Sequence, residues 1–235
     1  MSLTLPVDRA RWCDIDLVVS LVTATVSPTP LGAWLVPDER QRPVILAGVA
    51  RMWIEHAMLF GDAFLLRDGT AATVWFHRYR PIPPPPGYGR HLAETCGHHA
   101  PRFSLLDQTL AARRPVEAHN HLAFLAVPPG PRRAERAESV LAASHQCMDN
   151  LSLPTYAEAS SGTHRDLYHR HGYTDRDRFP RPDGATVYSL WRLAPFPTTP
   201  PPNAYRYTRQ PPKPSRNNRT PGRAPSRQAP DGPTM

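Results

Sequence analysis

Three arginines follow a short apolar run in the middle of the chain. Residues 122–127 (LAFLAV) are apolar, and the sequence PPGP after them indicates that a buried strand ends in a turn. Arg132, Arg133 and Arg136 then open a pattern of apolar residues at helical spacing. Unpaired N–H groups and a positive dipole at a helix N-terminus attract anions, and arginine adds cationic donors. The spacing therefore predicts a phosphate site.

A second segment, EASSGTHRDLYHRHGY, carries side chains that can move protons. A tyrosine such as Tyr168 has a pKa of about 10 and keeps its proton at neutral pH, as a general acid must. The alternative is a core tyrosine whose hydroxyl finds a buried partner. Glu158, Glu94, His119 and His121 are candidate general bases, and each has a solvated or hydrogen-bonded surface residue as its alternative.

The elements that must position these groups follow from hydrophobic periodicity and turn residues. Asp-Gly at 68–69 between two β-rich runs predicts a hairpin, and Gly61 is expected to end a long helix that begins at Arg42. Residues 81–86 (PIPPPP) predict a stiff extended loop. Helices are predicted over residues 42–60, 87–97, 101–114 and 163–171, and strands over 63–67, 70–77, 122–127, 153–159 and 186–193.

Both segments resemble the GNAT superfamily of acetyl-CoA-dependent N-acetyltransferases. The family signature Q/R-x-x-G-x-G/A falls on residues 132–137, and L-Y-x-R-x-G-Y at residues 167–173 is similar to the helix after the family's fifth strand. The resemblance covers about residues 34–193, and the order of segments is most similar to the puromycin N-acetyltransferase group of actinobacteria. It implies an α/β (α+β) fold with a mixed, mostly antiparallel sheet flanked by helices, and it favours a helix over residues 14–26, where β-branched residues alone favour a strand.

The resemblance also implies acetyl transfer from acetyl-CoA to a primary amine of a small molecule. Tyr168 would be the general acid, and Glu158, at the start of the fifth strand, is slightly favoured as the base. Acceptor-pocket residues would lie in the divergent stretch 78–119. The cofactor would be held by the edge of the fourth strand, the turn after it and a histidine that replaces a family asparagine: Leu125, Ala126, Val127, Arg132, Arg133, Ala134, Glu135, Arg136, Ala137 and His164.

Two positions of the turn depart from the family pattern. Glu135 stands where the family has glycine, and Arg133 stands where glycine is common. Glycine lets a backbone approach a phosphate closely, whereas Glu135 adds a negative charge near a negative ligand. This departure keeps a second hypothesis open, a catalytically degenerate protein of the same fold with weak or no CoA binding.

The net charge of +8 is concentrated at the C-terminal end of the 235 residues. Residues 195–235 contribute +6 of it and are rich in proline, which predicts a disordered tail after one GNAT-like domain over residues 1–194. A binding protein that acts through this tail is a third hypothesis. The nearly neutral domain and the lack of interleaved aromatic residues in the tail argue against nucleic-acid binding.

Composition bounds the location and the chemistry further. Three widely spaced cysteines without a C-x-x-C motif favour a reducing cytoplasm, and the abundance of Arg, Ala and Pro favours a bacterial genome of high GC content. The apolar run at residues 17–26 is too short to span a bilayer. The eleven histidines lack the spacing of a zinc site, so no metal is expected.

Overall fold

The computed structural model describes residues 7–195, so the predicted tail lies outside the described residues from residue 196 onward. Seven strands form one sheet in the order β1-β2-β3-β4-β5-β7-β6, and every neighbouring pair is antiparallel except β4 and β5. The predicted mixed, mostly antiparallel sheet is confirmed. The strands are β1 (Val7–Arg9), β2 (Gly61–Leu66), β3 (Ala72–Arg78), β4 (His119–Ala126), β5 (Thr155–Ala159), β6 (Thr174–Pro180) and β7 (Thr186–Arg192).

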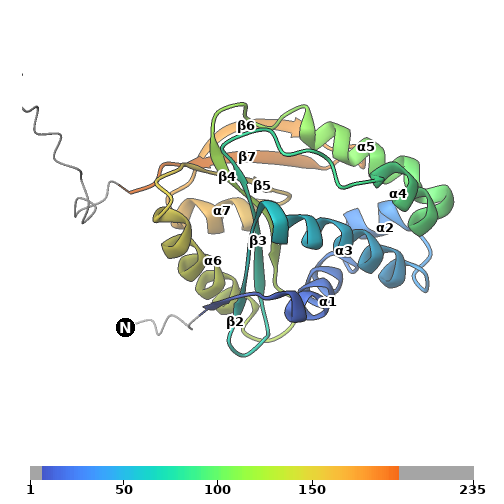
Figure 1. The fold of residues 1–235 in the computed structure, drawn as a ribbon, viewed down its shortest axis with the longest axis horizontal. Coiled ribbons are helices and arrows are strands. Elements are labelled where there is room, and N and C mark those ends of the chain that lie inside the picture. The colour runs from blue at the N-terminus through green and yellow to red at the C-terminus, as the bar shows by residue number, and fades with distance from the viewer. Residues whose placement is uncertain (1–6, 196–235) are drawn as a thin grey trace, which may run out of the picture. The chain divides into compact units, whose positions relative to one another are not determined.

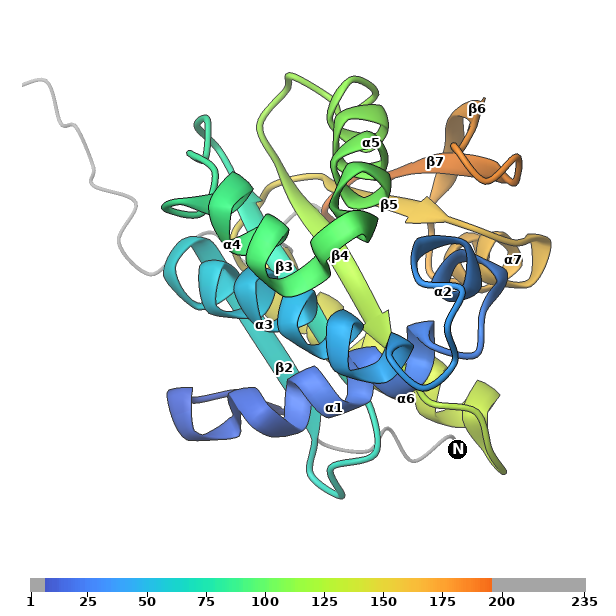
Figure 2. The same cartoon turned by 90° about the vertical axis from the view of Figure 1, so that its right-hand side faces the viewer.

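Helices cover both faces of the sheet (Figure 1). The face covered by α6 and α7 is called the α6 face, and the face covered by α1 and α3 is called the α3 face; α4 and α5 lie on the same side as α3 (Figure 2). The helices are α1 (Ile15–Val26), α2 (Pro30–Leu35), α3 (Arg42–Phe60), α4 (Tyr88–Cys96), α5 (Ala100–Ala111), α6 (Arg133–Asp149) and α7 (Gly162–Arg170).

The longest helix and the hairpin after it are where the sequence places them. A Cβ on Gly61 would lie 1.9 Å from the carbonyl oxygen of Trp75, so only glycine allows the chain to pass directly from α3 into β2. In the hairpin turn Gly69 has φ 68°, and Asp68 Oδ1 accepts hydrogen bonds from the N–H and hydroxyl of Thr70. Among the described helices, α3 alone has the length and apolar composition of a membrane span, and its Ile54 is fully buried in the core.

Packing overrides local preference in α1 and β6. Residues 15–26 form the helix that the resemblance implies, because Val18 and Val22 of this β-branched stretch are buried against α3 and the sheet. The sequence does not predict the strand β6, since only Phe179 of its charged stretch TDRDRFP is buried. It forms by pairing with β7 across the turn at residues 181–185.

The strand β4 contains one extra residue. Its pairing with β3 shifts between the pairs Trp75–Leu122 and Val74–Phe124, which leaves Ala123 without a partner of its own. Leu122 therefore packs on the α6 face, whereas both Ala123 and Phe124 pack on the α3 face. Beyond the bulge, Leu125 returns to the α6 face, where it contacts the start of α6.

Candidate active site

The parallel strands β4 and β5 separate where the predicted site begins. They are paired only from Asn120–Thr155 to Leu122–Ala157. Beyond this point β4 continues with β3 as its one strand neighbour, and β5 continues with β7 as its one strand neighbour. The β4 edge at Leu125 and Ala126 consequently has no strand partner within the described sheet, and such an edge can hydrogen bond an extended ligand.

The turn after β4 presents free amides at the start of α6. Arg132 precedes the helix in the left-handed conformation, with φ 59°, and no side chain caps the helix. The first intrahelical bond runs from the N–H of Arg136 to the carbonyl of Arg132, 2.9 Å. The N–H groups of Arg133, Ala134 and Glu135 therefore have no intrahelical partner.

Two of the three arginines shape the turn instead of projecting from it. The guanidinium of Arg136 donates to the carbonyls of Pro128 at 3.3 Å and Pro131 at 3.2 Å, and it lies 3.5 Å from that of Thr70 in the β2–β3 hairpin. Arg133 Nε donates to the carbonyl of Val127 at 3.1 Å. These bonds hold the turn without the glycines that the family signature uses.

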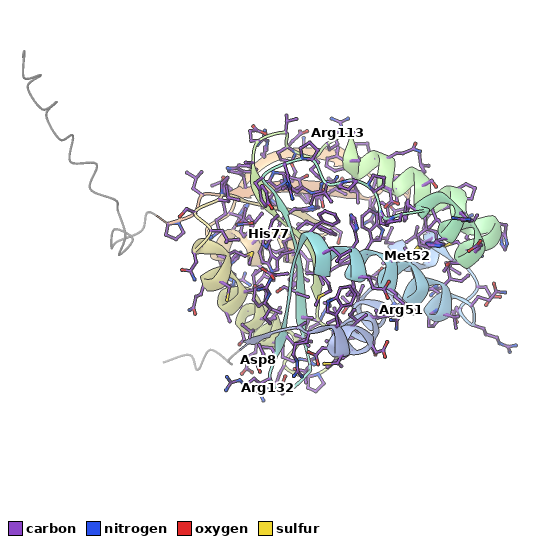
Figure 3. The ribbon with its side chains drawn as sticks, in the orientation of Figure 1. Asp8, Arg51, Met52, His77, Arg113 and Arg132 are labelled. Carbon is purple, nitrogen blue, oxygen red and sulfur yellow. The ribbon has the colours of Figure 1, made fainter. Side chains whose placement is uncertain are left out.

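The third arginine is paired with the glutamate that replaces a family glycine. Arg132 Nε and Nη2 donate to the two carboxylate oxygens of Glu135 at 2.7 and 2.5 Å, and both side chains are exposed (Arg132 is labelled in Figure 3). The hydrogen bonds from Arg132 lower the pKa of Glu135, so its carboxylate is ionised. A negative charge and its partner thus lie beside the free amides.

The start of α7 carries His164, the predicted cofactor contact. The Ser161 hydroxyl caps α7 by accepting the N–H of His164 at 3.2 Å. Burial lowers the pKa of His164, and the positive charge of nearby Arg133 lowers it further. The imidazole of His164 is therefore neutral and close enough to Arg133 to be affected by its charge, and a contact of His164 with the cofactor stays a prediction.

Tyr168 lies on the buried side of α7. Its side chain is 4% exposed, and its ring centroid is 5.3 Å from that of Tyr173. Burial raises the pKa of Tyr168, and the charge of Glu158 raises it further, so the phenol holds its proton. Its hydroxyl makes no hydrogen bond to any other residue within 7–195, which leaves it available to a ligand.

Glu158 forms a hydrogen-bonded network on the α3 face. Its carboxylate accepts bonds from His121 Nε2 and from the Tyr156 hydroxyl, both at 3.1 Å. Arg78 Nε lies 3.5 Å from His121 Nδ1, and because arginine only donates, Nδ1 is the acceptor and Nε2 carries the hydrogen. The network fixes both the tautomer and the orientation of His121.

The charges in this network follow from burial and contacts. Burial lowers the pKa of His121, which we assign as neutral. Burial also acts to raise the pKa of Glu158, but His121, the charge of Arg114 and the Tyr156 hydroxyl outweigh it and bring the pKa below its ordinary value. Glu158 is therefore a carboxylate that can accept a proton.

The other two candidate bases do not join this network. His119 donates from Nδ1 to the carbonyl of Glu117 at 2.6 Å, and burial lowers its pKa to about 4. Glu94 is exposed on α4. Within residues 7–195 no three His, Cys, Asp or Glu side chains form a group that could hold a metal ion.

Sequence reasoning missed Arg78 and Arg114, which act on the Glu158–His121 network, and Asp107, on which the charge of Arg114 also acts. The charge of Arg114 affects the pKa values of Glu158, His121 and Asp107, and Arg78 contacts His121 directly. The Tyr88 hydroxyl donates to Asp107. The one available signal was their place in the stretch 78–119, which the resemblance assigns to the acceptor pocket.

Two surface hollows lie away from these residues. One, of about 340 Å³, is lined by Pro37, Asp38, Gln41, His98, His99 and Arg102. The other, of about 590 Å³, lies beside β1 and the β2–β3 hairpin. We call the point where β4 and β5 separate the β4–β5 fork. Neither hollow includes a residue of this fork, so the chemistry of the fork, and not the size of a hollow, identifies the candidate site.

No protein-family model and no curated protein sequence matches the chain. Solved acetyltransferase structures are similar to it. A histone acetyltransferase HPA2 and related acetyltransferase from Corynebacterium glutamicum is 19% identical with a TM-score of 0.64, over 84% of this chain and 100% of that chain. The polyamine N-acetyltransferase of Drosophila melanogaster, which forms N-acetylagmatine, is 16% identical with a TM-score of 0.53, over 80% and 98%. A mosquito arylalkylamine N-acetyltransferase-like protein is 14% identical with a TM-score of 0.51, also over 80% and 98%. The chain therefore has the GNAT fold, and its place in the puromycin N-acetyltransferase group stays a prediction.

Proposed function

We propose that the protein is an N-acetyltransferase that moves an acetyl group from acetyl-CoA to a primary amine of a small molecule. The observation that carries the proposal is the fork between β4 and β5, with free helix amides after one strand and proton-transfer groups beside the other. The similar structures support it, because their names describe acetyltransferases, two of them acting on polyamines or arylalkylamines.

Acetyl-CoA fits the fork in two respects and conflicts with it in one. The amides of Arg133, Ala134 and Glu135 would bind the pyrophosphate, and the open β4 edge at 125–127 would bind the pantetheine amides. His164 and Arg133 would contact the same ligand, and the effect of the Arg133 charge on the pKa of His164 is in keeping with this. The Glu135 carboxylate opposes a negative ligand, although its pairing with Arg132 offsets part of the charge.

The residues around the fork supply the two proton transfers that the reaction needs. Acetyl-CoA supplies the acetyl thioester. The ionised Glu158, held by His121 and Tyr156, would accept the proton that the amine must lose before it attacks. Tyr168, whose pKa is raised by burial and by the charge of Glu158, would give its proton to the departing thiolate.

The degenerate alternative has a specific observation in its favour. The Arg132–Glu135 ion pair places a carboxylate at the helix end that a pyrophosphate would occupy. The alternative through the tail involves residues outside those described. A cytoplasmic location belongs to the proposal, and the free thiols of Cys13, Cys96 and Cys147 are in keeping with it.

Two measurements test the proposal. Saturating acetyl-CoA should raise the melting temperature, since a ligand that binds only the folded state stabilises it by mass action. Thiol release should then follow the addition of an amine from a panel of small primary amines. A melting temperature unmoved by CoA would favour the degenerate alternative, and binding without thiol release for any amine would contradict the proposed reaction.

A further inference from the structure

Within residues 7–195, two guanidinium groups on the α3 face form no direct ion pair with an acid. Arg78 is half-buried at the end of β3, opposite His119, and its guanidinium lies over the ring of Phe76 at 5.4 Å. Its polar contact within residues 7–195 is the one at 3.5 Å to His121, a neutral ring. A guanidinium offers five donors, so most of those of Arg78 are unused.

Arg114, in the turn after α5, is the second. It is half-buried, and its Nε is fully buried without a hydrogen-bond partner in the described chain. Its sequence neighbour Arg113 differs, since that guanidinium lies 3.8 Å from the carboxylate of Asp177 and 5.6 Å from the ring of Phe179 (Arg113 is labelled in Figure 3). The contrast shows that a partner for Arg114 is missing at a position where its immediate neighbour has one.

The nearby acids already have partners. The oxygens of Glu158 accept bonds from His121 and Tyr156, and Asp107 accepts one from the Tyr88 hydroxyl. Burial lowers the pKa of Arg78 to about 10 and the positive charge of Arg114 lowers it further, while the charge of Glu158 acts in the opposite direction. Within residues 7–195 neither arginine forms a direct ion pair with these acids, so guanidinium donors remain for an anion that arrives with the ligand.

We infer that the acceptor is an amine that also carries a carboxylate, as an amino acid does. Arg78 and Arg114 hold the carboxylate, because guanidinium groups bind carboxylates through paired, planar hydrogen bonds. Glu158 then faces the amine of the same molecule. The inference deepens the proposed acetyl transfer and rests on it for the identity of the reaction.

Matched acceptor pairs test the inference. Thiol release with acetyl-CoA should be measured for tyrosine against tyramine and for arginine against agmatine, which differ only in the carboxylate. We expect kcat/KM to be at least about tenfold higher for the carboxylated member of each pair, the effect of one or two charge-assisted hydrogen bonds. Equal or faster transfer to tyramine and agmatine would overturn the inference, and so would a preference for phosphoethanolamine over both amino acids.

Substitutions of the arginines test which side chains cause the preference for a carboxylated acceptor. Arg114→Gln should lower kcat/KM for tyrosine about 10- to 100-fold more than that for tyramine, because a loss that acts through the charge on Glu158 affects both amines equally. Arg113→Gln is the matched control and should change neither. Arg78→Lys keeps the charge but loses the planar fork, so it should lower the tyrosine value less than Arg114→Gln does. Equal losses for tyrosine and tyramine in Arg114→Gln would show a general structural role and overturn the inference.

A binding measurement separates this inference from the proposed function. Calorimetry should show that tyrosine binds the full chain more tightly than tyramine, and that Arg114→Gln removes the difference. If no amine is acetylated but this pattern holds, the reaction is wrong and the carboxylate site stands. If tyrosine and arginine do not bind at all, the carboxylate site is wrong, whatever amine is acetylated.

Discussion

Tyr168 and Tyr173 form a matched pair for testing the proposed general acid. Both rings are buried on the α6 face with centroids 5.3 Å apart, and substitution by phenylalanine removes one hydroxyl from either. Only Tyr173 uses its hydroxyl within the described fold, in a 2.9 Å hydrogen bond with His145 Nε2. The two substitutions should therefore have opposite signatures.

The magnitudes follow from these contacts. Tyr173→Phe leaves a buried His145 nitrogen unsatisfied and should lower the free energy of unfolding by about 1–3 kcal/mol, with little effect on transfer. Tyr168→Phe breaks no hydrogen bond, so we expect it to change stability by less than about 0.5 kcal/mol. Loss of a general acid should lower kcat by about 100- to 10,000-fold while CoA affinity is kept.

Three assays decide the matter: urea unfolding, CoA binding by calorimetry, and thiol release at saturating substrates. Tyr173→Phe controls for disturbance of the shared core, because it alters the same cluster without touching the proposed acid. Transfer by Tyr168→Phe at the wild-type rate would remove Tyr168 from the mechanism. If Tyr168→Phe lost as much stability as Tyr173→Phe, the hydroxyl of Tyr168 would have a structural partner.

Three further predictions concern the ends of two helices and a buried histidine. Glu135→Gln should tighten CoA binding by about fivefold, since one negative charge near the phosphates costs about 1 kcal/mol at a solvated surface; weaker binding in a titration would contradict this account of the turn. Ser161→Ala should lower the free energy of unfolding by about 1 kcal/mol through loss of the α7 cap, and urea curves identical to wild type would contradict the cap. Burial, aided by the charges of Arg192 and His171, lowers the pKa of His145 to about 2, so its contribution to stability is present above pH 6.5 and is lost as pH falls. The loss should reach about 2 kcal/mol at pH 5 and be absent in His145→Gln, as measured by unfolding at each pH.

The parts of the fold that the sequence predicted have local causes. The helix α3 begins near Pro43 and ends at a glycine that no other residue can replace, and the Asp68-Gly69 turn determines the hairpin by its own chemistry. The apolar run at 122–127 and its turn marked the β4–α6 junction. Each of these signals lies within a few consecutive residues, so the element can be predicted from its own stretch of sequence without reference to the rest of the chain.

The missing parts depend on pairing between distant residues. Nothing in TDRDRFP predicts β6, which pairs with β7 despite its charge. The pairing of His121 opposite Tyr156 brings Glu158 within reach, and this register is set by the parallel contact of β4 with β5 across more than thirty residues of chain. Within residues 7–195, the lack of a hydrogen-bond partner for Arg114 Nε is likewise a property of the packed molecule.

The bulge at Ala123 divides β4 into two halves whose side chains alternate independently. The first half directs His121 toward Glu158, and the second directs Leu125 toward the first turn of α6. Deleting Ala123 would leave Leu122 on the α6 face, Phe124 on the α3 face and Leu125 on the α6 face in uninterrupted alternation, so both halves would keep their present orientation. What the extra residue adds is the local bend and stronger twist of a bulged strand, at the point where β4 leaves β5. The deletion should therefore keep the proton-transfer side chains and the phosphate turn on their present sides of the sheet and change the direction in which the second half of β4 leaves β5.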